Sequence, residues 1–241
     1  KLAGLAATLD QDESDFLVGD LVPPAWHWIF FNPIARASAI GPDGHPNRGE
    51  FLPPVDLPRR MWAGGRILWK EHLLADDPVT RTSVVADVRH KSGKSGDLVF
   101  VVVRHQIAGM LGGVVEEEQD IVYRSAPNKY DPQPPAEVAP SEALWSRTIN
   151  PDPLLLFRYS ALTFNGHRIH YDYPYVTQKE GYPGLIVHGP LIATLLLDLC
   201  RRECRDQEIR RFEYRAISPL FAPLPFTVNG TLEESGRTAN L

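Results

Sequence analysis

Four short segments rich in valine and isoleucine follow one another in the first half of the chain. They cover residues 62–70, 79–89, 97–106 and 114–124. Turn-forming sequences separate them, such as KSGKSGD before the third segment and GMLGG before the fourth. Because neighbouring strands joined by tight turns pair in opposite directions, the pattern predicts an antiparallel sheet.

This sheet needs an apolar cover, because its third segment contains the continuous apolar run LVFVVV. Such a run is typical of a central strand that is covered on both faces. Residues 23–37 are the candidate cover, since Trp26, Ile29, Phe30, Phe31 and Ile34 fall near helical spacing. We therefore expect a helix in this region, with Pro33 kinking or ending it.

A proline-rich stretch divides the chain. Residues 126–140, APNKYDPQPPAEVAP, contain five prolines and show no apolar periodicity. Such a composition predicts an extended linker. We expect an N-terminal unit over residues 1–125 and a C-terminal unit over residues 141–241.

The second half has a different order of elements. A short strand, LWSRTI, precedes a helix that begins after Asp152, with Pro153 in its first turn and Leu155, Tyr159 and Leu162 on one face. Gly189 and Pro190 open a second helix that ends near Cys204, and the segments IRRFEYRAI and LPFTVNGTLEE have strand character. Each half thus offers an apolar helix and several strands, which predicts an α+β fold of two units, each a sheet against a helix.

Composition excludes several functions. The net charge is −5 and the pI about 5.9, so the chain offers no basic surface for nucleic acid. Its longest apolar run, LIATLLLDLC, is too short to cross a membrane. Two cysteines at helical spacing, Cys200 and Cys204, and no secretory signal predict a cytoplasmic protein. The duplicated layout is compatible with both a monomer and a homodimer.

Polar residues gather in RYSALTFNGHRIHYD, residues 158–172, and in GYPGLIVHGPL, residues 181–191. As metal ligands, His167 and His170 would need a helix to bring both rings to one side. The sequence after them favours extended backbone, in which they face opposite ways, so we expect no metal. A nucleophile such as Ser160 or Thr163 lacks the G-x-S-x-G elbow of hydrolases.

Addition of water to an α,β-unsaturated thioester fits these residue types better. It needs a base at the β-carbon, an acid for the α-carbon and donors for the charge on the carbonyl oxygen. A neutral histidine can serve as base and then as acid, and the amide of Asn165 can orient the water. Free backbone N–H groups where the Gly189 helix begins can hold the carbonyl oxygen.

The same stretch resembles the hydratase-2 motif, G-D-x-N-P-I-H, of the MaoC-like hot-dog enoyl-thioester hydratases and dehydratases. Matching Ile169 and His170 to its last two letters places Asn165 at the catalytic aspartate, Arg168 at the proline and His167 at the asparagine. The resemblance implies that His170 is catalytic and needs no cofactor. Either His170 acts alone while Asn165 holds the water, or Asp172 supplies the acidic group.

IVHGPL resembles the start of the family's central helix, where a backbone amide polarises the thioester. This implies an oxyanion hole at Gly189. The resemblance also implies a double hot-dog fold, in which a degenerate first half shapes the acyl pocket.

With LPRRMWAGGR and EEEQDIVYR, the chain is most similar to the branch of mesaconyl-C4-CoA (3-methylfumaryl-CoA) and itaconyl-CoA hydratases. Such a substrate is an acyl-CoA with an additional carboxylate, for which arginine is the natural partner. Arg60 and Arg168 are candidate contacts for this charge or for the CoA phosphates. Trp62 and His188 are further candidates for substrate contact.

Three other functions remain open at this point. One is the 3-hydroxyacyl-thioester dehydratase of fatty-acid synthesis, and another is a hot-dog thioesterase on the same scaffold. The third is a non-catalytic acyl-CoA binding module, which the replacement of the aspartate by Asn165 suggests.

Overall fold

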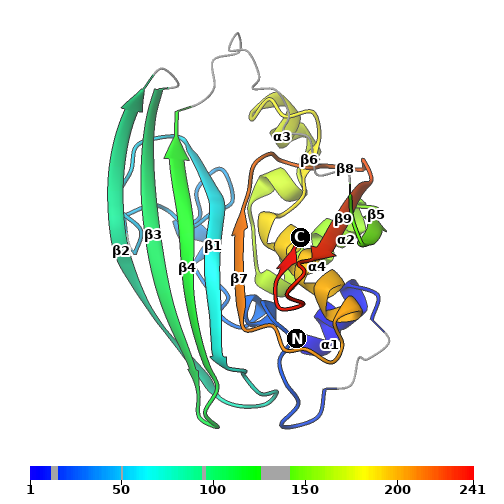
Figure 1. Cartoon of the computed structure of the whole chain (residues 1–241). Helices are drawn as coiled ribbons and strands as arrows, with labels where there is room; N and C mark the ends of the chain where they lie inside the picture. The colour runs from blue at the N-terminus through cyan, green and yellow to red at the C-terminus, as the bar shows by residue number, and fades with distance from the viewer. Residues whose placement is uncertain (12–15, 50, 94–95, 126–141) are drawn as a thin grey trace. The chain divides into compact units, whose positions relative to one another are not determined.

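The computed structural model describes residues 1–11, 16–49, 51–93, 96–125 and 142–241 (Figure 1). Its contacts divide the chain into two compact units that interleave along the sequence. One comprises Lys1–Pro46, Ala139–Ile209 and Pro219–Leu241, and the other comprises Asn47–Val138 and Arg210–Ser218. The predicted linker, residues 126–140, lies outside the described residues. A division into two hot-dog units at this stretch stays a prediction.

The second unit contains a five-stranded antiparallel sheet with the strand order β2-β3-β4-β1-β7 (Figure 1). The four strands predicted in the first half are confirmed, and three of them are longer than expected. The fifth, β7, comes from the segment that we expected to complete the second half, and it pairs with β1. The strands are β1 (Arg59–Glu71), β2 (Val79–Gly93), β3 (Gly96–Gly109), β4 (Val114–Arg124) and β7 (Arg211–Arg215).

Two glycines of β1 allow both neighbouring strands to approach closely. A Cβ atom on Gly64 would lie 2.5 Å from the carbonyl oxygen of Tyr214 in β7. A Cβ atom on Gly65 would lie 2.5 Å from the carbonyl oxygen of Glu118 in β4. No larger residue fits without moving a backbone, so this pair of glycines lets β7 join the sheet.

Residues 51–57 supply an apolar cover for this sheet. Leu52, Val55 and Leu57 pack against a buried cluster formed by Val101, Val103 and Tyr123. Arg48 holds the segment in place, because its guanidinium donates hydrogen bonds to the carbonyl groups of Val55, Leu57 and Pro58 and lies over the ring of Tyr123. A non-helical segment therefore packs where we had expected a helix to do so.

The helix expected over residues 23–37 is wrong. Only Trp26–Ile29 is helical, as the single 3₁₀ turn η1. Ala25, which precedes the turn, has a left-handed backbone with φ 66° and so ends any regular helix there. Trp26 and Ile29 are nevertheless buried, and η1 contacts the helix α2 (Pro153–Thr163) of its own unit.

The first unit is built around its helices. Those predicted after Asp152 and at Gly189 are confirmed as α2 and α4 (Gly189–Glu203). The side chain of Asp152 caps α2 by accepting from the Leu155 N–H at 2.7 Å. The buried face of α2 is formed by Leu156, Tyr159 and Ser160. None of the helices in the described part of the chain has the length and apolar character that crossing a membrane requires.

Helix α4 packs on a three-stranded antiparallel sheet with the order β10-β9-β5 (Figure 1). A two-stranded sheet pairs β6, just before this helix in sequence, with β8, which follows the helix. The remaining elements of this unit are α1 (Leu2–Thr8), β5 (Trp145–Ile149), η3 (Arg168–His170), α3 (Tyr173–Gln178), β6 (Leu185–Ile186), β8 (Phe221–Ala222), β9 (Phe226–Leu232) and β10 (Ala239–Asn240). A 3₁₀ turn η2 (Ala37–Ala39) follows η1 along the chain.

Asp198 joins three parts of this unit. Its carboxylate is buried in the middle of α4 and accepts hydrogen bonds from Gln11 at 2.6 Å, Arg147 at 2.7 Å and Arg202 at 2.8 Å. Gln11 follows α1, and Arg147 belongs to β5. A buried carboxylate with three donors is compensated for its loss of water, and it holds these elements on the helix.

Replacing Asp198 by Ala leaves two guanidinium groups without their anion. We expect the variant to lose about 3 kcal/mol in the free energy of unfolding, measured by urea denaturation. The control is Glu203→Ala at the exposed end of the same helix, which should change stability by less than about 0.5 kcal/mol. Equal losses in the two variants would contradict this role of Asp198.

Candidate active site

His170 is fixed in one orientation by the backbone. It ends the 3₁₀ turn η3, and its side chain is buried with 7% exposure. Its Nδ1 lies 2.7 Å from the carbonyl oxygen of Ile186 in β6. A carbonyl oxygen only accepts, so Nδ1 carries the proton and donates it, and Nε2 keeps its lone pair. The extended backbone expected for residues 167–170 is wrong.

Burial sets the charge of this ring. Loss of water lowers the pKa of His170 to about 4, although the hydrogen bond to Ile186 acts in the opposite direction. Positive charge on His45 lowers the pKa further. The ring is therefore neutral at pH 7, and its Nε2 is able to accept a proton.

His188 supports the ring of His170. The two rings are stacked, with centroids 3.6 Å apart and planes 18° apart. His188 is the N-cap residue of α4, is 1% exposed, and has its Nε2 2.8 Å from the hydroxyl oxygen of Ser160. Burial, followed by the charges of His170 and His167, holds the pKa of His188 well below its usual range. This burial favours a supporting role over the substrate contact that we expected.

Asn165 closes the turn between α2 and η3. Its backbone N–H donates to the carbonyl oxygen of Ser160 at 2.9 Å, and its Oδ1 accepts from the backbone N–H of His167 at 3.0 Å. The half-buried side chain has no further hydrogen bond to the described residues. Its NH₂ group can therefore donate to a water molecule or a substrate oxygen, whereas its carbonyl group is largely committed to the turn.

Asp172 is occupied by structural contacts. Its Oδ1 caps α3 by accepting from the Tyr175 N–H at 3.0 Å, and its Oδ2 accepts two hydrogen bonds from Arg168. The hydrogen bond from Tyr175 and those from Arg168 lower the pKa of Asp172. An ionised, fully engaged carboxylate is a poor proton donor, so the geometry does not favour Asp172 as the acidic partner.

The guanidinium group of Arg168 is also engaged in structural contacts. Its guanidinium binds Asp172, donates to the carbonyl oxygen of Pro42 at 2.9 Å and lies 4.1 Å from the ring centroid of Tyr175. It therefore holds the loop that contains the motif, residues 165–170 (the motif loop), against residues 42–43. This arrangement favours a structural role over a contact with a carboxylate or phosphate of the substrate.

Gly189 provides an open donor at a helix N-terminus. It is the first residue of α4, and its backbone N–H has no acceptor among the described residues. A Cβ atom at this position would meet nothing within 4 Å. Its φ is not positive, so the conformation does not require glycine. Open space beside an unpaired N–H at the positive end of a helix suits a developing oxyanion.

Arg60 and Trp62 lie on β1 in the other compact unit. Trp62 donates its Nε1–H to the carbonyl oxygen of Gly64 at 2.8 Å and meets the ring of Tyr214 edge-on at 5.8 Å. Arg60 is half-buried opposite Tyr123 of β4. Trp62 therefore packs around the glycines that let β7 join the sheet, and the assignment of both residues to substrate binding stays a prediction.

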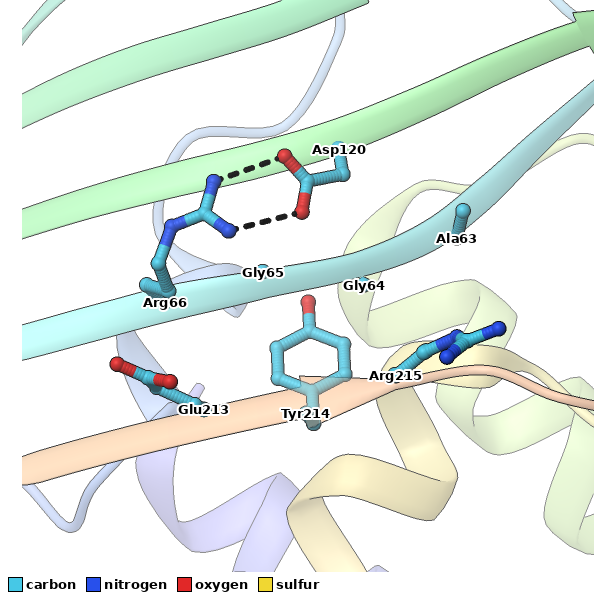
Figure 2. A pocket seen from close by; sticks show the side chains of 8 residues that line it. All are labelled: Ala63, Gly64, Gly65, Arg66, Asp120, Glu213, Tyr214 and Arg215. Atoms are coloured by element: carbon cyan, nitrogen blue, oxygen red, sulfur yellow. Dashed lines mark hydrogen bonds and ion pairs between the residues drawn. The ribbon is translucent and has the colours of Figure 1, made fainter. Parts of the chain in front are cut away.

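This unit contains a pocket of about 330 Å³, and Figure 2 shows the side chains that line it. Within it, Arg66 donates to both carboxylate oxygens of Asp120 and also binds Glu118. Sequence reasoning missed this pocket because one of its walls is β7, which we had expected in the other half. Its lining residues are Ala63, Gly64, Gly65, Arg66, Asp120, Glu213, Tyr214 and Arg215.

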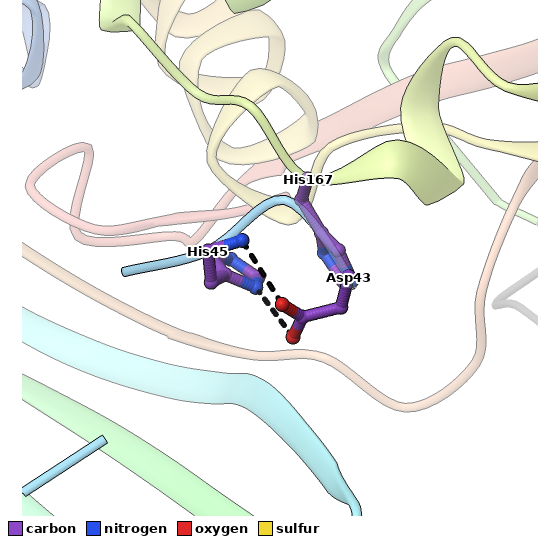
Figure 3. Close-up of side chains that lie close together, drawn as sticks. All are labelled: Asp43, His45 and His167. Carbon is purple, nitrogen blue, oxygen red and sulfur yellow. Dashed lines mark hydrogen bonds and ion pairs between the residues drawn. The ribbon is translucent and has the colours of Figure 1, made fainter. Parts of the chain in front are cut away.

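A second group of polar side chains adjoins the motif loop and was also missed (Figure 3). His45 approaches Asp43 twice, with its Nδ1 3.3 Å from Oδ2 and its backbone N–H 3.0 Å from Oδ1. The rings of His45 and His167 have centroids 4.0 Å apart. Burial raises the pKa of Asp43, but the hydrogen bonds from His45 outweigh this and hold it far below its usual range. The sequence DGHP, residues 43–46, is the signal that could have pointed to this pair.

Asp43, His45 and His167 have ligand atoms within 4.8 Å of one another, which is close enough for one cation. Two imidazoles that bind one tetrahedral zinc ion would place their centroids roughly 5 Å apart. The observed 4.0 Å is shorter, and both carboxylate oxygens already accept from His45. The geometry therefore fits a hydrogen-bonded cluster better, and the absence of a metal stays a prediction.

Comparison with known proteins identifies this arrangement. The family model for hydroxyacyl-thioester dehydratase type 2 matches residues 25–222. The mesaconyl-C(4)-CoA hydratase of Chloroflexus aurantiacus is 48% identical over 222 residues, which cover 92% of this chain and 79% of that protein.

Solved structures agree on the fold. A MaoC-like dehydratase from Phytophthora capsici matches with a TM-score of 0.64 and 15% identity over 98% of this chain and 83% of that one. A double hot-dog protein from Mycobacterium tuberculosis matches with a TM-score of 0.50 and 13% identity over 98% of this chain and 76% of that one. The predicted double hot-dog, α+β fold and the MaoC-like resemblance are thus confirmed. The chain belongs to the family of type 2 hydroxyacyl-thioester dehydratases.

Proposed function

We propose that this enzyme reversibly adds water to the double bond of an enoyl-CoA thioester, and that its substrate is the branched dicarboxylic mesaconyl-C4-CoA. The observation that carries the reaction is the geometry of His170, whose Nδ1 is held by Ile186 and whose Nε2 is left as a neutral base. The reverse reaction, loss of water from a hydroxyacyl thioester, gives the family its description. Both directions use the same groups.

The positions of two backbone-anchored groups support this reaction. His188 stacks on His170 and directly precedes Gly189, so the open N–H of Gly189 lies close to the base. In the hydration direction, Nε2 of His170 takes a proton from water while the oxygen bonds to the β-carbon. The electron pair of the double bond moves to the thioester oxygen, which the Gly189 N–H stabilises. The α-carbon then takes up a proton, and the carbonyl group is restored.

The substrate assignment rests on similarity and charge. The Chloroflexus relative is named for mesaconyl-C(4)-CoA and shares nearly half of its residues with this chain. A second carboxylate on the acyl group calls for a cation, and Arg168 is already paired with Asp172. The contact with Arg60 stays a prediction. Itaconyl-CoA and the hydroxyacyl thioesters of fatty-acid synthesis are the competing substrates. The location in the cytoplasm and the choice between monomer and homodimer stay predictions, as does the lack of a cofactor.

Replacing His170 by Gln tests the base. The Gln side chain has no nitrogen that accepts a proton, so we expect kcat for hydration to fall at least 10³-fold. Loss of the enone absorbance of mesaconyl-C4-CoA measures the reaction. The matched control is His90→Gln on the exposed part of β2, which should keep full activity. Turnover within tenfold of the parent in the His170 variant would sink the assignment.

The dependence of kcat/KM on pH follows from the lowered pKa of His170. Below about pH 4 the ring is protonated in the folded protein and is no longer a base. As the pH falls from 7, we therefore expect kcat/KM to hold its value down to about pH 5 and to fall below that. The unfolded chain binds this proton near pH 6.5, so stability also declines between these two values as the pH falls. Returning samples to pH 7 separates a reversible loss of activity from unfolding. A midpoint of the kcat/KM profile near pH 6.5 would contradict a buried base.

A panel of mesaconyl-C4-CoA, itaconyl-CoA and crotonyl-CoA tests the acyl group. We expect kcat/KM to be highest for mesaconyl-C4-CoA and at least tenfold lower for crotonyl-CoA, which lacks the carboxylate. Arg60→Gln should reduce this preference. Equal kcat/KM for mesaconyl-C4-CoA and crotonyl-CoA would refute the substrate assignment while leaving the reaction class intact. Free thiol released from a saturated acyl-CoA would instead indicate a thioesterase.

A further inference from the structure

Hydration requires two proton transfers, one from water and one to the α-carbon, and the described site so far contains one proton-transfer group. The base must remove a proton from water, and an acid must deliver a proton to the α-carbon. Asn165 does not titrate, and both oxygens of Asp172 are engaged. The Asp43–His45 pair beside the motif loop offers a second titratable group (Figure 3).

The structure anchors this pair firmly to the loop that carries His170. The backbone N–H of Arg168 donates to the carbonyl oxygen of Asp43 at 2.9 Å. Gly44 has φ +90°, and a Cβ atom there would lie 1.9 Å from the carbonyl oxygen of Gly166. Only glycine permits both this conformation and this approach. Residues 43–45 and 166–168 are thus pressed together, although more than a hundred residues separate them in sequence.

Within this contact, Asp43 orients the ring of His45 and places an anion beside it. The carboxylate receives both the ring Nδ1–H and the backbone N–H of His45, which fixes the ring relative to its own backbone. The hydrogen bonds keep Asp43 ionised. An anion at this distance stabilises the imidazolium form of the ring. The side chain of His45 is 22% exposed, so part of the ring is accessible to a bound substrate, in contrast to the buried His188.

His45 also lies in a row of imidazoles that leads to the base. Its ring adjoins that of His167 at 4.0 Å, and His167 meets His170 edge-on at 5.5 Å. Charge on His45 is sensed by His170, since it lowers the pKa of that ring. His170 is thus buried and neutral, whereas the ring of His45 is paired with the carboxylate of Asp43.

We propose that His45, oriented by Asp43, is the second proton-transfer residue of the hydration reaction. The inference rests on the proposed function. Water loses a proton to Nε2 of His170 as its oxygen bonds to the β-carbon. The resulting enolate takes the proton from Nε2 of the His45 imidazolium at the α-carbon. The site ends with His170 protonated and His45 neutral, and a proton passing from one ring to the other, directly or through solvent, restores the starting state.

Replacing His45 by Gln tests the proposal in the full-length chain. We expect kcat for hydration of mesaconyl-C4-CoA to fall about 10²–10³-fold, with KM within about threefold of the parent value. His45→Ala should regain activity when free imidazole is added, which a purely structural residue would not show. Asp43→Asn should lower kcat about tenfold, and the double variant should be no slower than the His45 variant alone.

The exposed pair of His90 and Asp97 is the matched control, because it has the same residue types at hydrogen-bond distance on the other compact unit. His90→Gln and Asp97→Asn should leave kcat unchanged. If the His45 variants do not fold, Asp43→Asn keeps the side-chain volume and must still reduce kcat more than KM. Unchanged kcat in folded His45→Gln would overturn the proposal.

The activities of the parent chain and of the His170 and His45 variants distinguish a failure of the role of His45 from a failure of the proposed function. A parent chain without turnover, or an active His170→Gln variant, would refute the hydratase itself. An active parent chain with a fully active His45→Gln variant would refute only the role of His45. A stoichiometric metal ion in the purified protein, lost together with activity on chelation and on replacement of His167, would likewise overturn it in favour of a metal centre.

Discussion

The hydrogen bond from Nδ1 of His170 to the carbonyl oxygen of Ile186 decides what this site is able to do. It selects the neutral tautomer with an unprotonated Nε2, and it fixes the plane of the ring. Ile186 is held in turn by pairing of β6 with β8 and by the hydrogen bond from the Val187 N–H to Leu220. The tautomer of the base is therefore set by a backbone carbonyl group and not by a second side chain.

Helix α4 links this base to the oxyanion donor. His188 caps the helix, stacks on His170 and places Gly189 next in the chain. The helix is held in turn by Asp198, whose carboxylate accepts hydrogen bonds from Gln11, Arg147 and Arg202. One rigid element thus fixes both the support of the base and the donor for the carbonyl oxygen, which is the preorganisation that stabilises a developing charge.

Local signals in the sequence predicted much of this arrangement. The strands β1–β4 and the first turns of α2 and α4 depend on residues close in sequence, such as the cap at Asp152 and Pro190 after Gly189. The extent of the helical segment near Trp26 was wrong. Ala25 has a left-handed backbone, so no regular helix runs from residue 23 into Trp26, and the helical turn ends at Ile29. The spacing of apolar residues along the sequence also does not reveal which sheet a strand such as β7 joins.

The candidate site was predictable only in part, because some of its contacts join residues that are far apart in sequence. His170 and Gly189 belong to one contiguous motif, so their neighbourhood could be foreseen. The contact of Asp43 and His45 with that motif depends on two glycines, Gly44 and Gly166, that meet across a long stretch of chain. The engagement of Arg168 and Asp172 with each other likewise follows from the turn that η3 makes.

Long-range ¹⁵N–¹H correlation spectra of the histidine rings test the central claim most directly. For His170 at pH 7 the account predicts a protonated Nδ1 and an unprotonated Nε2, a pattern that should disappear in the His170→Gln spectrum. It also predicts that this state persists as the pH falls to about 5, because burial lowers the pKa of the ring to about 4. A protonated Nε2, or an imidazolium at pH 6, would contradict the assignment of His170 as the base.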